Sequence, residues 1–203
     1  MSVLPQATPL RPLADPGVLA NARLTATTGI ALFLLFAMEG VTILSLRRLI
    51  IPHAIIGFLL IPPVLLKLGS TGYRFVRYYS GQPSYRQAGP PDTILRVDAP
   101  VVVASTCVVF LSGVALWVFG TSRLWLVLHK GSFIFWLFAT GVHVLGYLDR
   151  APRLALSDVL DRPPLKGTLG RRSLIIGSLV LGTVLAVVMV SGWLTPFHFA
   201  REG

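Results

Sequence analysis

Residues 124–148 read LWLVLHKGSFIFWLFATGVHVLGYL, and Lys130 is the one position in this stretch with a fixed charge. A helix needs about 20 mostly apolar residues to cross the hydrocarbon core of a bilayer. The stretch meets that requirement, and the chain holds four more of the same kind, over 24–46, 53–76, 99–120 and 173–194. The pattern predicts an all-α integral membrane protein with five transmembrane helices.

The composition excludes most soluble classes of protein. The chain has 203 residues, of which 54% are hydrophobic and 13% are charged, and its mean hydropathy is +0.74. Soluble domains carry about 25% charged residues, so a soluble nucleic-acid-binding domain is a poor explanation of the net charge of +10. The single cysteine, Cys107, excludes an intrachain disulfide framework and a cysteine-based metal cluster.

The positive charges follow the loops. Five spans alternate in direction, and most lysines and arginines fall on the side that holds the N-terminus. By the positive-inside rule this side is cytoplasmic, which puts the C-terminus outside a bacterial-type plasma membrane. Membrane lipid is then the expected surrounding, and no nucleic acid is needed to explain the charge. The cations on this side are Arg11, Arg23, Arg74, Arg77, Arg86, Arg96, Arg150, Arg153, Arg162, Lys166, Arg171 and Arg172.

Prolines and glycines mark the segments between the spans. The proline-rich start lacks the features of a signal peptide and predicts a flexible cytoplasmic tail. A second loop is expected over 77–98. The predicted organisation is a tail over 1–23, a four-helix bundle over 24–148, a cytoplasmic loop over 149–172, a fifth helix over 173–194 and an extracytoplasmic tail over 195–203.

Two histidines are expected at the same depth. His53 opens the second span and His129 lies a few residues into the fourth, and these two spans run in the same direction. Ionisable residues within spans are costly and point to function. Imidazoles at matched depth on neighbouring helices can bind one haem iron from both faces. The alternative for each histidine alone is a polar residue facing interfacial water.

A third histidine repeats the spacing. His143 follows His129 by fourteen residues, about 40° short of four helical turns, so both lie on one face about 21 Å apart. Lys67 follows His53 at the same spacing. His143 is either a ligand or an interfacial histidine. Lys67 could snorkel to the interface, bind an anionic group or act as an unusual axial ligand. Pro62 and Pro63 should kink the helix between His53 and Lys67.

This pattern resembles the bacterial membrane cytochrome b proteins, whose histidine pairs with thirteen intervening residues lie on two helices of a four-helix bundle. The ferric-reductase-like domains share it. The resemblance covers residues 24–148 and implies haem b held between the histidine-bearing helices. It assigns His53 and His129 to the outer pair and His143 to the inner pair, with Lys67 in the place of the other inner histidine. It therefore implies one haem b, with a second as an open alternative.

Several other residues could serve such a site. Arg47 and Arg48 could pair with the haem propionates, or could simply be interface cations. Gly57 and Gly113 lie at the right depth to admit the edge of a porphyrin, although glycine is also common in spans for packing alone. Glu39 could accept a proton or hydrogen-bond a histidine ligand; the alternative is a salt bridge with an arginine.

Two classes of function compete. One is an electron-transfer subunit that carries electrons through haem b between a quinone or cytoplasmic donor and a partner oxidoreductase subunit, or, with a different acceptor, a transmembrane ferric reductase. No dinucleotide-binding glycine motif is present, so a partner subunit is expected. The other is a cofactor-free transporter or assembly subunit, but transporters usually show inverted repeats and broken helices in both halves.

Overall fold

The computed structural model describes residues 15–160 and 165–191, and it is all-helical there. Five helices are long and apolar enough to cross a membrane: α1 (Pro16–Ile43), α2 (Leu46–Tyr79), α4 (Thr93–Phe119), α5 (Arg123–Tyr147) and α7 (Thr168–Val190). Two short helices, α3 (Pro83–Ala88) and α6 (Arg150–Leu160), lie between them. The predicted all-α fold with five candidate spans is confirmed.

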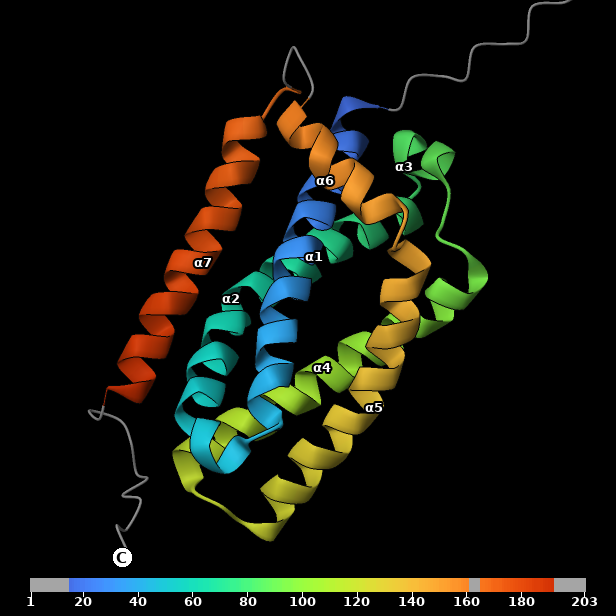
Figure 1. Cartoon of the computed structure of the whole chain (residues 1–203). Coiled ribbons are helices and arrows are strands. Elements are labelled where there is room, and N and C mark those ends of the chain that lie inside the picture. The colour runs from blue at the N-terminus through green and yellow to red at the C-terminus, as the bar shows by residue number, and fades with distance from the viewer. Residues whose placement is uncertain (1–14, 161–164, 192–203) are drawn as a thin grey trace, which may run out of the picture.

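The helices form two antiparallel hairpins. Helix α1 packs on α2, and α4 packs on α5, while the hairpins approach each other mainly where α2 nears α4. Helix α7 lies along α2, on the far side from α5 (Figure 1). A cluster of Leu32, Leu60 and Val64, joined by Phe36 and Phe110, forms the core between α1, α2 and α4.

Several helix boundaries differ from the prediction, and α2 begins at Leu46, seven residues before His53. Helix α1 begins at Pro16, because the Asp15 carboxylate accepts hydrogen bonds from the backbone N–H groups of Gly17 and Val18. The Ser84 hydroxyl also donates to Asp15 and, with these bonds, lowers the pKa of that carboxyl. Helix α4 begins at Thr93, within the expected loop over 77–98, and the expected loop over 149–172 contains α6 and the start of α7. The predicted tails lie outside the described residues for 1–14 and 195–203.

The expected kink also lies elsewhere. The backbone angles of α2 stay helical through Pro62 and Pro63 and leave the helical region only at Leu49, where φ is −111° and ψ is 20°. Leu49 lies next to Arg48, whose carbonyl loses its intrahelical donor because Pro52 has no N–H. The break therefore falls in the first turn of α2, at the membrane end that holds His53.

Helix α7 docks where a proline has freed a backbone carbonyl. Pro63 cannot donate to the Leu59 carbonyl, and Gly182 of α7 lies against this carbonyl so closely that a Cβ atom would overlap it. Small residues allow such close approach of helices in a membrane. Ser178, one turn earlier, is also buried. The fifth span thus packs on α2 at a specific backbone contact.

A buried ion network ties α6 to two of the spans. Asp158 of α6 lies 3.7 Å from the Arg23 guanidinium of α1 and accepts hydrogen bonds from Nε and a terminal nitrogen of Arg171 on α7. All three side chains are buried. Arg172 donates to the Asp158 backbone carbonyl at 3.1 Å. This network, the "α6 latch", joins the first and last spans through the segment that was expected to be a loop.

Candidate functional site

His53 and His129 face each other across the two hairpins. Their ring centroids are 6.3 Å apart and their ring planes are nearly perpendicular, at 85°. Both side chains are half-buried. The two rings meet although the backbones of α2 and α5 make almost no close approach. The structure thus brings together the two residues that were predicted to lie at one depth.

The ring of His53 is held through Nδ1. This nitrogen lies 2.9 Å from Oγ1 of Thr42 and 3.0 Å from Oε1 of Glu39, both on α1. The Thr42 hydroxyl already donates to the Glu39 backbone carbonyl, so its oxygen can only accept from His53. An ionised Glu39 can also only accept, so beside it a neutral His53 carries its proton on Nδ1 and its Nε2 presents a lone pair.

The ring of His129 is held in the same way. Its Nδ1 lies 3.0 Å from the Val109 carbonyl of α4 and 3.3 Å from Oγ of Ser112. A carbonyl oxygen can only accept, so Nδ1 is the donor and Nε2 again presents the lone pair. Ser112 in turn donates to the Val108 carbonyl at 2.6 Å. Both histidines therefore have the tautomer that a metal ligand needs.

Gly113 makes room for the His129 ring. A Cβ atom at this position would lie 3.0 Å from Cε1 and 3.3 Å from Nδ1 of that ring, closer than side chains normally pack. A Cβ atom at Gly57 would lie 3.6 Å from Oε1 of Glu39, which is an ordinary contact. Of the two glycines predicted to serve the site, Gly113 is thus the one where an added methyl group would press on a histidine ring.

The separation of the two rings is compatible with two axial ligands of one metal ion. Imidazoles that bind a metal from opposite sides, each through a nitrogen at about 2.0–2.1 Å, would have ring centroids roughly 6 Å apart. The observed separation of 6.3 Å agrees with this value. Metal-binding histidines usually donate their other N–H to a carboxylate or a carbonyl, as both rings do here. The residues present therefore fit a bis-histidine centre.

The donor set is too small for a bare metal ion. Within residues 15–160 and 165–191, no group of three or more His, Cys, Asp or Glu side chains is arranged to hold one. A haem iron needs only two protein ligands because the porphyrin supplies four nitrogens. Haem suits this pair of imidazoles better than a structural or catalytic zinc site, which takes three or four protein ligands.

Glu39 and the two arginines take different positions. Glu39 pairs with His53 and not with an arginine, and its second oxygen, Oε2, is buried without a hydrogen-bond partner in the part of the chain described. Arg47 and Arg48 are exposed in the first turn of α2, six and five residues before His53. No side-chain partner within the described ranges engages either guanidinium, so their role toward haem propionates stays a prediction.

Lys67 is occupied by α1. Its ammonium group donates to the Thr25 carbonyl at 2.7 Å, and it lies over Gly29, where a Cβ atom would come within 2.9 Å of Nζ. The side chain is half-buried and bridges two helices, so it does not reach toward the interface as the first of its three interpretations requires. A protonated amine that donates a hydrogen bond has no lone pair for a metal.

His143 has a carboxylate neighbour that the sequence did not suggest. Its Nδ1 lies 3.5 Å from Oδ2 of Asp98, and its ring stacks obliquely on Tyr147 at a centroid distance of 5.0 Å. Both facing atoms are buried without a hydrogen-bond partner among the residues described. Asp98 was missed because the third span was expected to begin at Ala99. The Pro90–Pro91–Asp92 run was the available signal, because such residues typically precede the first turn of a helix.

An aromatic layer separates the two polar levels. Phe36 of α1 contacts Trp136 of α5 and Phe110 of α4, with ring centroids 4.7 Å and 6.5 Å apart. Trp136 lies seven residues from both His129 and His143 and donates to Thr106 Oγ1 at 2.9 Å. The bundle therefore has a His53–His129 level, an apolar middle and a Lys67–His143–Asp98 level.

Comparison with known proteins adds no assignment. A scan against protein-family models matches no family, and searches of curated proteins and of solved structures find no significant match. The resemblance to membrane cytochrome b proteins rests on the histidine spacing in the sequence and stays a prediction.

Proposed function

We propose that this protein is a membrane b-type cytochrome that binds one haem b between His53 and His129. The observation that carries the proposal is the pair of imidazoles that face each other at 6.3 Å, each with Nδ1 bound to a neighbouring helix and Nε2 left as the free nitrogen. When bound, the haem supplies a one-electron ferrous–ferric couple. Two axial histidines leave no open position on the iron, so electron transfer is favoured over chemistry at the metal.

The surrounding residues have defined tasks in this proposal. Glu39 and Thr42 accept from Nδ1 of His53 and so fix the orientation of its ring. The Val109 carbonyl does the same for His129. Arg47 and Arg48 are the cations available for the propionates at this end. The aromatic layer of Phe36, Phe110 and Trp136 separates the His53–His129 level from the Lys67–His143–Asp98 level.

A second haem is not part of the proposal. Lys67 donates to Thr25, and His143 is paired with Asp98, so the inner level has no two free ligands facing each other. We therefore expect one haem per chain.

The first experiment measures colour and haem content. Detergent-purified protein should give a Soret band and a sharp alpha band after dithionite, with one haem per chain by pyridine haemochrome. His53→Ala and His129→Ala should each lose the haem, while His143→Ala, the matched control at the other level, should keep it.

Two outcomes would contradict the proposal. A folded but colourless protein would favour the cofactor-free transporter or assembly subunit. Full haem content in both His53→Ala and His129→Ala would refute the ligand assignment. Haem loss in His143→Ala alone would move the site to the inner level.

A membrane-dissolved donor such as a quinol suits the inner level. A shallow, open apolar depression lies on the surface of α4 and α5, and its lining includes Ile94, Val97 and Asp98. Quinols release protons as they give up electrons, and the Asp98–His143 pair could accept them. Neither atom that forms this pair has another partner in the described ranges.

A substitution in this donor site should change the rate at which the haem is reduced and should leave the haem content unchanged. Asp98→Asn should slow the reduction of the haem by a soluble quinol about 10²-fold or more, the usual contribution of a general base. The haem content should stay at one per chain. Asp149→Asn, an exposed carboxylate beyond the end of α5, is the control. Equal reduction rates in both variants would remove Asp98 from the donor site.

In the cell, we place the protein in a bacterial-type plasma membrane with its N-terminus on the cytoplasmic side. Most of the arginines lie at the end of the bundle that holds α3, α6 and the start of α1, and this supports the orientation. We propose a partner oxidoreductase subunit as the electron acceptor.

A further inference from the structure

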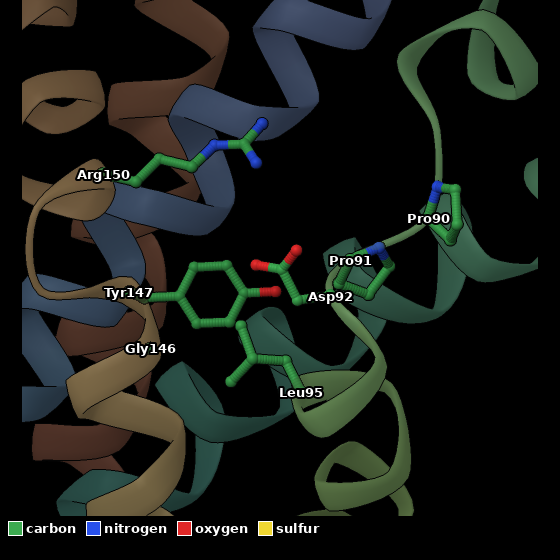
Figure 2. Close-up of a pocket in the computed structure, with 7 residues that line it drawn as sticks. All are labelled: Pro90, Pro91, Asp92, Leu95, Gly146, Tyr147 and Arg150. Carbon is green, nitrogen blue, oxygen red and sulfur yellow. The ribbon is translucent and has the colours of Figure 1, made fainter.

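A small pocket lies at the arginine-rich end of the bundle, between the start of α4 and the end of α5. Its volume is about 110 Å³. Pro90, Pro91 and Leu95 form its apolar wall, and the polar groups of Asp92, Tyr147 and Arg150 converge on it (Figure 2). The pocket borders the inner level, because its Tyr147 contacts the His143 ring, and its size suits a small polar group.

The polar side chains that line this pocket are not paired with one another. No hydrogen bond or ion pair joins Asp92, Tyr147 and Arg150 in the described part of the chain. Asp92 is the N-cap residue of α4, but its carboxylate makes no capping bond. Figure 2 shows this carboxylate turned toward the Tyr147 hydroxyl, with the Arg150 guanidinium above both. A carboxylate and a guanidinium beside one pocket, each without a partner, can bind a ligand that carries both charges.

A second guanidinium adds to the positive side. Arg74 of α2 donates to the Gly89 carbonyl at 3.2 Å and lies close enough to Arg150 and Tyr147 to interact with them electrostatically. Two neighbouring guanidinium groups attract a phosphate, which arginine binds with several hydrogen bonds. The pocket itself therefore combines the Arg150 guanidinium and the Tyr147 hydroxyl with the Asp92 carboxylate, and Arg74 adds positive charge from beyond its wall.

We propose that this pocket binds the headgroup of an ethanolamine phospholipid. Its phosphate would pair with Arg150 and Arg74 and accept from the Tyr147 hydroxyl, while its primary ammonium would donate to Asp92. The proline wall would face the glycerol, and the acyl chains would run along the apolar surfaces of α4 and α5. Tyrosine and arginine at this depth lie at the level of lipid headgroups. A choline headgroup has no N–H to donate, and a glycerol headgroup has no cation for Asp92.

Native mass spectrometry of the detergent-purified full chain tests this site. The probes are phosphatidylethanolamine, phosphatidylcholine and phosphatidylglycerol with identical acyl chains. Wild-type protein should retain the ethanolamine lipid about tenfold better than the other two, because only its primary ammonium can donate a charge-assisted hydrogen bond to Asp92. Asp92→Asn should remove the preference over phosphatidylglycerol. Arg150→Gln should weaken all three lipids.

Matched controls use residues of the same kind outside the pocket. Asp149→Asn and Arg153→Gln change exposed charges at the same end of the bundle and should leave the lipid preference intact. Haem content, measured on the same samples, reports folding of each variant independently of lipid binding. Equal retention of the three lipids by wild-type protein would overturn the proposal. A preference for phosphatidylglycerol that Asp92→Asn leaves unchanged would also overturn it, in favour of a general anionic-lipid surface.

Discussion

At the scale of single residues, the tautomer of each histidine decides what it can bind. His53 and His129 are each held at Nδ1 by an acceptor on a neighbouring helix, so each leaves Nε2 as the free nitrogen. His143 is different, because its Nδ1 faces a carboxylate oxygen at 3.5 Å without a hydrogen bond. Three histidines of one spacing pattern thus divide into a neighbouring pair, His53 and His129, and a third histidine that lies beside Asp98.

Gly113→Ala tests this geometry without removing a ligand. The added methyl group would lie 3.0 Å from the His129 ring and must push it aside. Overpacking costs about 1–3 kcal/mol, which corresponds to roughly 5- to 150-fold weaker haem binding. Gly57→Ala, whose methyl group would have normal contacts, should bind haem like the wild type. Haem titration of the purified apoproteins measures both, and equal affinities would show that the ring pose at His129 does not matter.

At the scale of helices, proline and glycine act together at the α2–α7 contact. Pro63 leaves the Leu59 carbonyl without an intrahelical donor, and Gly182 brings the α7 backbone against that oxygen. A Cα–H group offers a weak hydrogen bond to such a carbonyl. The prolines of α2 therefore create a docking point for α7 while the helix remains continuous, which is a different role from the kink that their presence predicts.

Gly182→Ala should weaken this docking. Its methyl group would overlap the backbone of Leu59, which cannot turn away as a side chain can, so we expect a loss of about 1–3 kcal/mol in the free energy of unfolding. Gly177→Ala on the same helix, where a Cβ atom meets nothing within 4 Å, is the control. Thermal unfolding in detergent compares them. Equal melting temperatures would mean that α7 is not held at this point.

At the scale of the whole molecule, one carboxylate joins three separate segments. Asp158 of α6 lies between Arg23 of α1 and Arg171 of α7, so the α6 latch closes the arginine-rich end of the bundle. Figure 1 shows α6 crossing α1 next to the start of α7. A buried ion pair is not strongly stabilising in itself, but removal of one partner leaves an uncompensated buried charge.

Asp158→Asn should therefore be severely destabilising. Loss of the carboxylate leaves two buried guanidinium groups side by side, and breaking a buried pair costs about 3–5 kcal/mol. The measurements are thermal unfolding in detergent and limited proteolysis at the α6 segment, with the exposed Asp149→Asn as control. If Asp158→Asn and Asp149→Asn have the same melting temperature, the α6 latch does not stabilise this end of the bundle.

The sequence by itself determined the class of fold, the five candidate spans and the shared face of His129 and His143. These follow from chain length, apolar composition and helical periodicity, which are local properties. Only the tertiary structure decided the partners: Glu39 and Thr42 on His53, Thr25 on Lys67, Asp98 beside His143 and Asp158 between two arginines. Periodicity fixes the depth and face of a residue within its own helix. The rotation of one helix against another depends on packing between segments far apart in the chain, and no local pattern encodes it.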